Sequence, residues 1–273
     1  MPFSDRLRIG VLGAGGRMGR TIAAAVAAAP DLHLVAAIDP ANAGGELAVE
    51  GLEVPLGISS ELSALTAGSV DVAIDFTVAS AAVENLAFLA ANGIHAVCGT
   101  TGIGADDIEA LREAFGDTDA PNCVLASNFA VSAVLMMRLS ALAAPFFDNA
   151  EIVELHHEHK RDAPSGTAVA TAAAIDAARS SAGLGPFGDD PTTTETMAGA
   201  RGARSGGGVQ LHSVRLAGLV AHQEVLFGTT GQSLTIRQDS YDRSSFVPGV
   251  LLAARRVPRT PGFTYGLEAL LGL

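Results

Sequence analysis

A glycine-rich turn near the start of the chain constrains its fold more than any other stretch. The apolar run Leu7–Leu12 has the composition of a buried strand and leads directly into residues 13–19, GAGGRMG. A helix-forming run, Arg20–Ala29, follows, and a second apolar run, His33–Ile38, ends in Asp39. This order of strand, glycine turn, helix, strand and acidic residue is typical of the βαβ unit that binds dinucleotides.

Each part of this unit has a physical task. Glycines let the backbone turn tightly and approach a pyrophosphate, and the following helix N-terminus offers N–H donors and a partial positive charge. Asp39 is placed to accept hydrogen bonds from the adenosine ribose. The spacing departs from GxGxxG, because Met18 takes the place of the third glycine and Gly19 comes one residue later. The residues expected to bind the pyrophosphate are Gly13, Ala14, Gly15, Gly16, Arg17 and Met18.

The residue after the acid bears on the choice of cofactor. A carboxylate at Asp39 repels the 2′-phosphate of NADPH, and Pro40 stands where an arginine would attract that phosphate. This pair favours NADH. Arg17 and Arg20 flank the glycine turn and are within reach of a phosphate, so the sequence leaves the use of NADPH open.

Strands and helices continue to alternate through the first half of the chain. Residues 41–69 are the exception, and we expect a loop there with a short helix near residues 60–65. The alternation predicts an α/β fold with a Rossmann-like, doubly wound parallel sheet. Ligands of such sheets bind beyond the carboxyl ends of the strands, where turn residues Gly99, Thr100 and Thr101 fall. Further strands are predicted at 71–77, 94–98 and 123–126, and helices at 80–92 and 105–115.

Beyond residue 128 the pattern changes. A β-like run at 150–155 and a helix at 167–180 precede three alternating runs separated by glycines, 209–215, 221–227 and 232–237. These runs predict a second, α+β domain with a mixed or antiparallel sheet, of the kind that forms subunit interfaces. A last apolar helix, 244–256, would pack most simply on the first domain. We therefore expect a dinucleotide-binding domain of residues 1–128 completed by 241–273, and a substrate-binding and oligomerisation domain of residues 129–240.

Composition excludes several classes of function. The net charge of −12 and the pI of about 4.9 argue against nucleic-acid binding, which needs basic surface. The apolar stretch 129–147 approaches the length of a membrane span, but Arg138 near its middle and Pro145 near its end favour an interior or interface helix. The N-terminus shows no signal-peptide pattern, so we expect a cytoplasmic protein without membrane association. Cys98 and Cys123 lie in apolar runs and are expected to be buried thiols.

Against this acidic background, one cationic stretch stands out. Residues 156–161, HHEHKR, follow a strand, and Ser165, Gly166 and Thr167 then open a helix. Such a place can bind an anionic substrate and supply a proton, although a solvated loop is the alternative. We expect no metal, because consecutive histidines on a strand point to opposite faces and the stretch lacks the helical HExxH pattern.

Several motifs in the same order along nearly the whole chain resemble one family. The motifs are residues 13–19, GTTG at 99–102, SNF at 127–129, ELHHEHK at 154–160 with DAPSGT at 162–167, and Phe227-Gly228 with Arg243 and Phe246. In these motifs the chain resembles the 4-hydroxy-tetrahydrodipicolinate reductases (dihydrodipicolinate reductases) of bacterial lysine and diaminopimelate synthesis.

The resemblance implies an NAD(P)H-dependent oxidoreductase that reduces a small dicarboxylate and forms homotetramers through the sheet of its second domain. It implies His156 as proton donor or acceptor and Lys160 as a second proton donor, with the substrate carboxylates on His157, Ser165, Gly166 and Thr167. Pro40 departs from the basic residue that some members carry after the acid. The residues that would line the nicotinamide side are Gly99, Thr100, Thr101, Ala126, Ser127, Asn128 and Phe129.

Two other functions fit part of the sequence. Another two-domain NAD(P)-dependent dehydrogenase would account for the first half but leaves the block at 154–167 unexplained. A non-catalytic NADH-sensing protein would need a DNA- or partner-binding module, and this acidic chain offers no helix-turn-helix.

Overall fold

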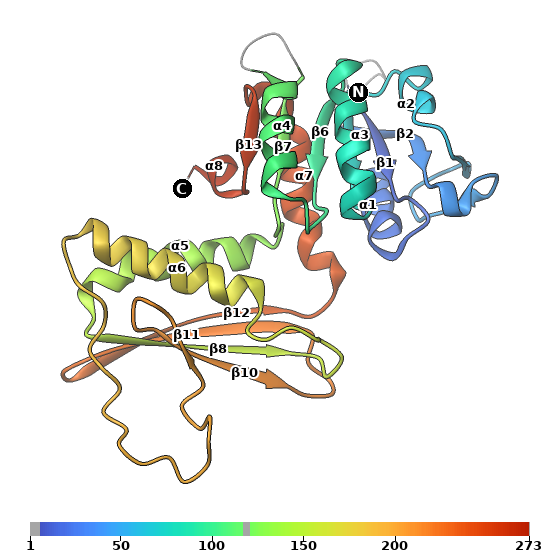
Figure 1. Cartoon of the computed structure of the whole chain (residues 1–273). Helices are drawn as coiled ribbons and strands as arrows, with labels where there is room; N and C mark the ends of the chain where they lie inside the picture. Colours follow the sequence, from blue (N-terminus) through green and yellow to red (C-terminus); the bar gives the residue numbers. More distant parts are fainter. Residues whose placement is uncertain (1–5, 117–120, 273) are drawn as a thin grey trace. The chain divides into compact units, whose positions relative to one another are not determined.

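The computed structural model describes residues 6–116 and 121–272. The chain divides into two compact units (Figure 1). Unit 1 combines Met1–Phe129 with Arg243–Leu273, and unit 2 is the continuous stretch Ala130–Asp242. Unit 1 is therefore assembled from both ends of the chain.

The sheet of unit 1 has the strand order β13-β7-β6-β5-β1-β2-β4-β3. Its paired strands run parallel, apart from the antiparallel pair β3–β4. The order reverses at β1, which lies between β5 and β2, and this is the topological switch point at which doubly wound sheets bind ligands. The predicted Rossmann-like fold class is confirmed. The strands are β1 (Leu7–Leu12), β2 (Leu32–Ile38), β3 (Glu46–Leu47), β4 (Leu56–Ser59), β5 (Val72–Asp75), β6 (His95–Cys98), β7 (Cys123–Leu125) and β13 (Phe263–Tyr265).

The helices of unit 1 pack in pairs. α1 contacts α7, which also packs on β5 and β6, and α3 contacts α4. Figure 1 shows α3 and α4 in front of the sheet and α7 behind it. Short 3₁₀ turns η2 (Pro40–Asn42), η4 (Arg243–Phe246) and η5 (Val257–Arg259) join these elements. The helices are α1 (Arg17–Ala28), α2 (Ser63–Ala67), α3 (Ala79–Ala91), α4 (Ala105–Phe115), α7 (Val247–Arg256) and α8 (Glu268–Leu271).

The expectation of a loop over residues 41–69 is wrong in part. This stretch contains β3 and β4, and β4 extends the parallel sheet by pairing with the end of β2 at Ala37–Ile58 and Ile38–Ser59. Such short strands carry no hydrophobic period of their own and are fixed by the neighbouring strand. The helix expected near 60–65 lies at Ser63–Ala67. The helix expected from residue 244 begins at Val247, because Pro248 suits the first turn of a helix and not its interior.

Unit 2 is a five-stranded mixed sheet covered on one face by two helices (Figure 1). The central strand β8 runs parallel to β10 and antiparallel to β11. α5 packs on α6 and β12, and α6 packs on β8. Side chains from both layers form one apolar core, including Ile152, Val225 and Phe227 from the sheet and Met136 and Ile175 from the helices. The elements are β8 (Asn149–His156), β9 (Ala203–Arg204), β10 (Gln210–Arg215), β11 (Ala221–Thr229), β12 (Gln232–Ser240), α5 (Val131–Ala143), η3 (Ala144–Phe146) and α6 (Gly166–Ser181).

The apolar stretch 129–147 forms α5 and the short turn η3. Met136 and Ala144 are buried in the core of unit 2. Among the described residues, none of the helices has both the length and the hydrophobicity that a bilayer span requires.

Gly19 explains the shifted glycine spacing. It lies in the first turn of α1, where the helix passes close to the preceding turn, and a Cβ at this position would overlap the carbonyl oxygen of Gly13 and lie 2.8 Å from the Cα of Ala14. Both atoms belong to the backbone and cannot move aside cheaply. Gly19 therefore allows the close approach that the third glycine provides in the GxGxxG pattern.

We predict that Gly19→Ala lowers the free energy of unfolding by about 1–3 kcal/mol, the usual cost of overpacking. The matched control is Gly57→Ala in β4, where an added Cβ meets nothing within 4 Å. That control should change stability by no more than about 0.5 kcal/mol. Urea unfolding followed by circular dichroism measures both variants, and equal stability of the two would contradict this packing role.

Candidate active site

The glycine turn of unit 1 lies at the carboxyl end of β1. Gly13 has a φ of +74°, a conformation that residues with a side chain rarely adopt. The backbone N–H groups of Gly13 and Ala14 both donate to the carbonyl of Ile38, at 2.8 and 3.1 Å. The turn is thereby fixed to the end of β2.

The N-terminus of α1 is open to an anion. Gly16 and Arg17 are exposed there, and no side chain among the described residues caps the helix. Asp39, only 8% exposed, accepts hydrogen bonds from the N–H groups of Gly15 at 2.9 Å and Ala41 at 3.1 Å. This carboxylate joins the glycine turn to the start of η2. The open helix N-terminus and the adjoining acid have the chemistry that a dinucleotide requires.

A second buried carboxylate organises the ends of β5 and β6. Asp75 is fully buried and accepts hydrogen bonds from the N–H and hydroxyl of Thr77, at 2.9 and 2.8 Å, and from the hydroxyl of Thr100 at 2.9 Å. Its other oxygen accepts from the amide of Asn85 at 2.7 Å. The loops after these neighbouring strands are therefore held together by one carboxylate.

Phenylalanine rings fill the space behind these loops. A Cβ at Gly99 would overlap the ring of Phe76, and the centroid of that ring lies 5.8 Å from the centroid of Phe129. Ala126 and Phe129 are buried, whereas Thr101 and Ser127 are exposed. Because the parent strands are parallel neighbours, the predicted residues at 99–101 and 126–129 share one edge of the sheet with the glycine turn.

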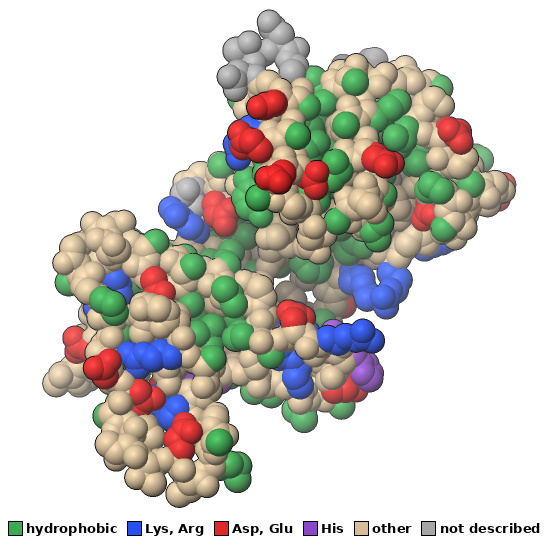
Figure 2. All heavy atoms as spheres, viewed as in Figure 1, with side chains coloured by type: hydrophobic (Ala, Val, Ile, Leu, Met, Phe, Trp, Pro, Cys, Tyr) green, Lys and Arg blue, Asp and Glu red, His purple; other side chains and the backbone are tan. Residues whose placement is uncertain are grey.

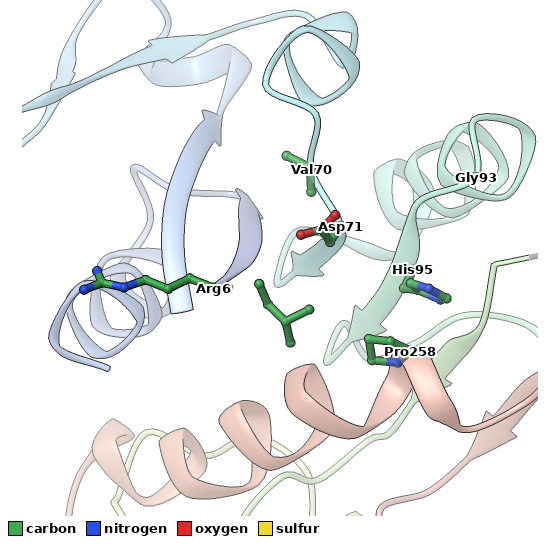
Figure 3. A pocket seen from close by; sticks show the side chains of 7 residues that line it. Arg6, Val70, Asp71, Gly93, His95 and Pro258 are labelled. Atoms are coloured by element: carbon green, nitrogen blue, oxygen red, sulfur yellow. The ribbon is translucent and has the colours of Figure 1, made fainter. Parts of the chain in front are cut away.

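A cavity of about 400 Å³ lies at the amino ends of the strands of this sheet (Figure 3). Its lining includes Arg6, Asp71 and His95, which lie at or near the starts of their strands. His95 Nδ1 accepts a hydrogen bond from the N–H of Asn122 at 2.9 Å, and burial lowers its pKa against the nearby Asp71. Cofactors of doubly wound sheets bind at the carboxyl edge, so this cavity is not the expected cofactor site.

A buried glutamate forms the centre of the predicted substrate site in unit 2. Glu154 Oε2 lies 2.5 Å from His156 Nδ1 and 2.9 Å from Arg215 Nη1. Its Oε1 accepts from Arg215 Nη2 at 2.8 Å and from the N–H of Ser165 at 3.1 Å. The Glu154 side chain is fully buried, and the guanidinium binds it through two parallel hydrogen bonds.

These contacts set the charge of both groups. Burial raises the pKa of Glu154, but the hydrogen bonds from Arg215, Ser213 and His156 outweigh burial and hold the pKa below its ordinary value. Burial lowers the pKa of His156, and the opposing effect of Glu154 does not restore it. At neutral pH, Glu154 is therefore a carboxylate and His156 a neutral ring that donates its Nδ1–H to Glu154.

The loop after β8 is held by hydrogen bonds among its own polar groups. Both carboxylate oxygens of Asp162 lie 2.8 Å from Lys160 Nζ, and the N–H of Lys160 donates to the carbonyl of His157 at 3.2 Å. Arg215 Nη2 also donates to the carbonyl of Asp162 at 2.7 Å. His156 and Lys160 are partly buried, whereas His157 is exposed. Figure 2 shows histidine and cationic side chains gathered at this end of unit 2.

The N-terminus of α6 borders this loop. Ser165 caps the helix by accepting a hydrogen bond from the N–H of Ala168 at 3.2 Å. Gly166 is exposed, and a Cβ there would meet nothing within 4 Å. The first turn of this 16-residue helix contains no acidic side chain. The structure thus brings together the predicted residues His156, Ser165, Gly166 and Thr167.

Sequence reasoning missed Arg215 as the partner of Glu154, and it missed the contact of Asp75 with Thr100, although Thr100 itself was predicted for the nicotinamide side. Arg215 lies 61 residues beyond Glu154, and Thr100 lies 25 residues beyond Asp75, so no local pattern reveals either pair. His159 extends into solvent with 84% of its side chain exposed. Among the described residues there is no group of three or more side chains suited to a metal ion.

Two sequence models of one family match almost the whole chain. "Dihydrodipicolinate reductase, N-terminus" matches residues 7–129, and "Dihydrodipicolinate reductase, C-terminus" matches residues 132–271. Two relatives named 4-hydroxy-tetrahydrodipicolinate reductase, from Corynebacterium aurimucosum and Mycobacterium ulcerans, are each 49% identical over 267 residues. The matches cover 98% of this chain and 99% and 100% of the respective relatives.

Solved structures agree with the sequence matches. A dipicolinate-bound dihydrodipicolinate reductase from Paenisporosarcina sp. TG-14 superposes with a TM-score of 0.84 at 36% identity, covering 97% of this chain and 99% of that one. An amine dehydrogenase from Mycobacterium smegmatis, with a TM-score of 0.64 and 15% identity over 97% of this chain and 96% of its own, shares the fold alone. The chain belongs to the dihydrodipicolinate reductase family.

Proposed function

We propose that this chain reduces 4-hydroxy-tetrahydrodipicolinate to tetrahydrodipicolinate in lysine and diaminopimelate synthesis, with His156 and Lys160 handling the protons. As a family member it is an NAD(P)H-dependent oxidoreductase. The observation that carries the proposed site is the cluster around Glu154, which holds a histidine and a helix N-terminus beside a lysine-bearing loop. The alternative functions, another dehydrogenase or an NADH sensor, do not explain why the chain contains this cluster.

The carboxyl edge of the unit 1 sheet is proposed to bind the cofactor. Gly13–Met18 would hold the pyrophosphate at the open N-terminus of α1, and Asp39 would bind the adenosine ribose. Residues 99–101 and 126–129 would contact the nicotinamide end. When bound, NAD(P)H supplies the hydride. The exposed turn, the absence of a side-chain cap among the described residues and the buried acid support this assignment.

The end of β8 and the start of α6 are proposed to bind the substrate. The substrate is a dicarboxylate, and the solved relative carries dipicolinate, also a dicarboxylate. Backbone N–H groups at a helix N-terminus attract anions. Ser165–Thr167 would take one carboxylate, and the exposed His157 would assist on the other side of the loop.

Proton transfer is proposed to use two different groups. Reduction of a conjugated imine adds a hydride at one carbon, and the atom that gains electron density must then be protonated. The ammonium group of Lys160, which is paired with Asp162 in the loop between β8 and α6, is the proposed proton donor. His156 rests as a neutral ring with its Nδ1–H on Glu154, so its Nε2 is the nitrogen that accepts a proton. The conjugated imine forms when the 4-hydroxyl group and a proton from the carbon next to the imine carbon leave as water, and His156 Nε2 is proposed to accept that proton. Lys160 is proposed to donate the proton that follows the hydride.

The open face of the unit 2 sheet is proposed as the surface that builds a homotetramer. α5 and α6 cover the other face. Leu226, 37% exposed, lies on the open face beside ion pairs such as Arg237–Glu224, a mixture typical of subunit interfaces. A cytoplasmic location and the preference for NADH also remain predictions.

Lys160→Ala is expected to lower kcat by roughly 10²–10⁴-fold, the usual contribution of a general acid. NADH affinity should stay within about twofold of wild type, since Lys160 lies outside the proposed cofactor site. The control is Arg161→Ala, which removes the adjacent exposed cation. Stopped-flow absorbance at 340 nm gives kcat, and fluorescence titration gives NADH affinity. A loss of NADH affinity with unchanged kcat would show that the role is misassigned.

Pro40→Arg is expected to raise the ratio of kcat/KM for NADPH to that for NADH by about tenfold, through one charge-assisted contact with the 2′-phosphate. Pro55→Arg is the control, because Pro55 is exposed and immediately precedes β4, at the amino edge of the sheet. Steady-state kinetics with both cofactors provide the test. An equal change in both variants would argue for general electrostatics and against a ribose site at Asp39.

The acid limb of the pH profile should reflect His156. Its pKa lies below 6.5, so the neutral, proton-accepting ring persists until the pH falls below that value. We expect kcat/KM to be flat from about pH 8 to 6.5 and to decline at lower pH as the ring is protonated. In His156→Ala this limb should disappear. An increase in kcat/KM on acidification would instead identify the protonated ring as the active form.

A further inference from the structure

We propose that Glu154, clamped by Arg215, is a positioning residue that fixes the tautomer of His156 and couples that ring to the N-terminus of α6. This inference rests on the proposed function, since it gives His156 a catalytic task. Glu154 lies on the helix-facing side of β8, two residues before His156, so both side chains point to the same side of the sheet.

The hydrogen-bond geometry allows one arrangement of the imidazole. A carboxylate only accepts hydrogen bonds, so at 2.5 Å the His156 Nδ1 must be the protonated nitrogen. Nε2 then has the lone pair and is the nitrogen that exchanges protons. Without Glu154, either tautomer would be accessible and the ring could rotate about its side-chain bonds.

Arg215 makes this carboxylate a rigid reference point. Its guanidinium donates to both oxygens of Glu154, at 2.9 and 2.8 Å, and to the carbonyl of Asp162 at 2.7 Å. One cation therefore connects β10, β8 and the loop that bears Lys160. Burial of the ring is the main reason why the pKa of His156 stays low beside this carboxylate, and the positive charges of Lys160 and Arg215 act in the same direction.

The same carboxylate contacts the residue at which α6 begins. Glu154 Oε1 accepts the N–H of Ser165, the residue that caps the helix. The proposed carboxylate-binding amides at Gly166 and Thr167 follow immediately. A displacement of Glu154 would therefore move the proton-exchanging ring and the anion-binding turn together. This coupling distinguishes Glu154 from an ordinary buried ion pair.

The opposite face of the same strand provides a matched comparison. Glu151 Oε2 lies 2.8 Å from His212 Nε2, and Glu151 Oε1 lies 2.6 Å from Arg201 Nη2. The partner types are the same as those of Glu154. However, Glu151 and Glu154 are three residues apart on β8, and side chains at an odd spacing on a strand point to opposite faces of the sheet. Glu151 therefore faces away from α6. Glu151→Gln removes an equivalent charge from β8 without affecting His156.

The decisive variant is Glu154→Gln. A glutamine with its carbonyl oxygen at the Oε1 position would keep the hydrogen bonds from Ser165 and Arg215 Nη2 and lose only the one from Arg215 Nη1. Its NH₂ group would then face His156. The ring must then accept at Nδ1 and carry its proton on Nε2. We expect long-range ¹H–¹⁵N spectra of histidine-labelled protein to show this change of tautomer, with the signal assigned by its loss in His156→Ala. We also expect kcat to fall by ~10²-fold or more, with NADH affinity unchanged.

A double-mutant cycle separates positioning from general damage. In a His156→Ala background, Glu154→Gln should change kcat by less than about threefold, because the residue through which it acts is gone. Glu151→Gln should retain the wild-type kcat and tautomer, and size-exclusion chromatography of each variant monitors assembly. An unchanged tautomer in Glu154→Gln, or an equal loss of kcat in both backgrounds, would overturn the proposal.

Two further outcomes are informative. If Glu154→Gln does not fold, Glu154→Asp and Arg215→Lys take its place: the aspartate should retain the Nδ1–H tautomer with part of the activity, and the lysine should lose activity with the charge preserved. Loss of that tautomer in the aspartate variant would contradict the proposal. If His156→Ala retains the wild-type kcat, the catalytic role of His156 fails, while the tautomer of Glu154→Gln still decides the positioning role.

Discussion

The ion pair between Glu154 and Arg215 is the interaction on which the geometry of unit 2 depends. A carboxylate without solvent contact is costly unless donors replace the water it has lost. Here the donors come from three separate places: a guanidinium on β10, a histidine on β8 and the backbone N–H of Ser165. Removing any one of them leaves a buried charge partly unsatisfied. The arrangement therefore resists local distortion at the place where the substrate is proposed to bind.

Unit 1 also contains a buried carboxylate that is satisfied by several hydrogen-bond donors, but the donors are of other types. Asp75 ends β5 and is satisfied by hydroxyl, amide and backbone groups, mainly from Thr77 and Thr100. In both units the strand packs apolar side chains into the core and has a buried acid at or near its carboxyl end. The apolar part anchors the strand in the core, and the acid fixes the loops that follow. Each proposed half of the active site is thus held by the strand that precedes it.

Much of the fold could be predicted from the sequence, because its signals are local. β1 and α4 have the predicted limits, and the glycine turn lies at the expected strand end. β3, β4 and β13 were missed, since strands of two to four residues are defined by their neighbours. Glu154 was visible in the motif, but its role depends on Arg215, which is distant in sequence. Gly19 was visible too, and only the approach of Gly13 explains its place.

The discontinuous make-up of unit 1 has a consequence for synthesis on the ribosome. β7 pairs with β6 on one side and with β13 on the other, so its outer edge stays unpaired until residues 263–265 have been translated. The surfaces of α1, β5 and β6 that α7 covers are likewise open until residues 247–256 have been translated. Unit 2 is a continuous segment that is complete when Asp242 emerges. The unit whose translation starts first is therefore the last to be completed. Until then its unpaired strand edge can pair with other chains, and chaperones act on exposed edges of this kind.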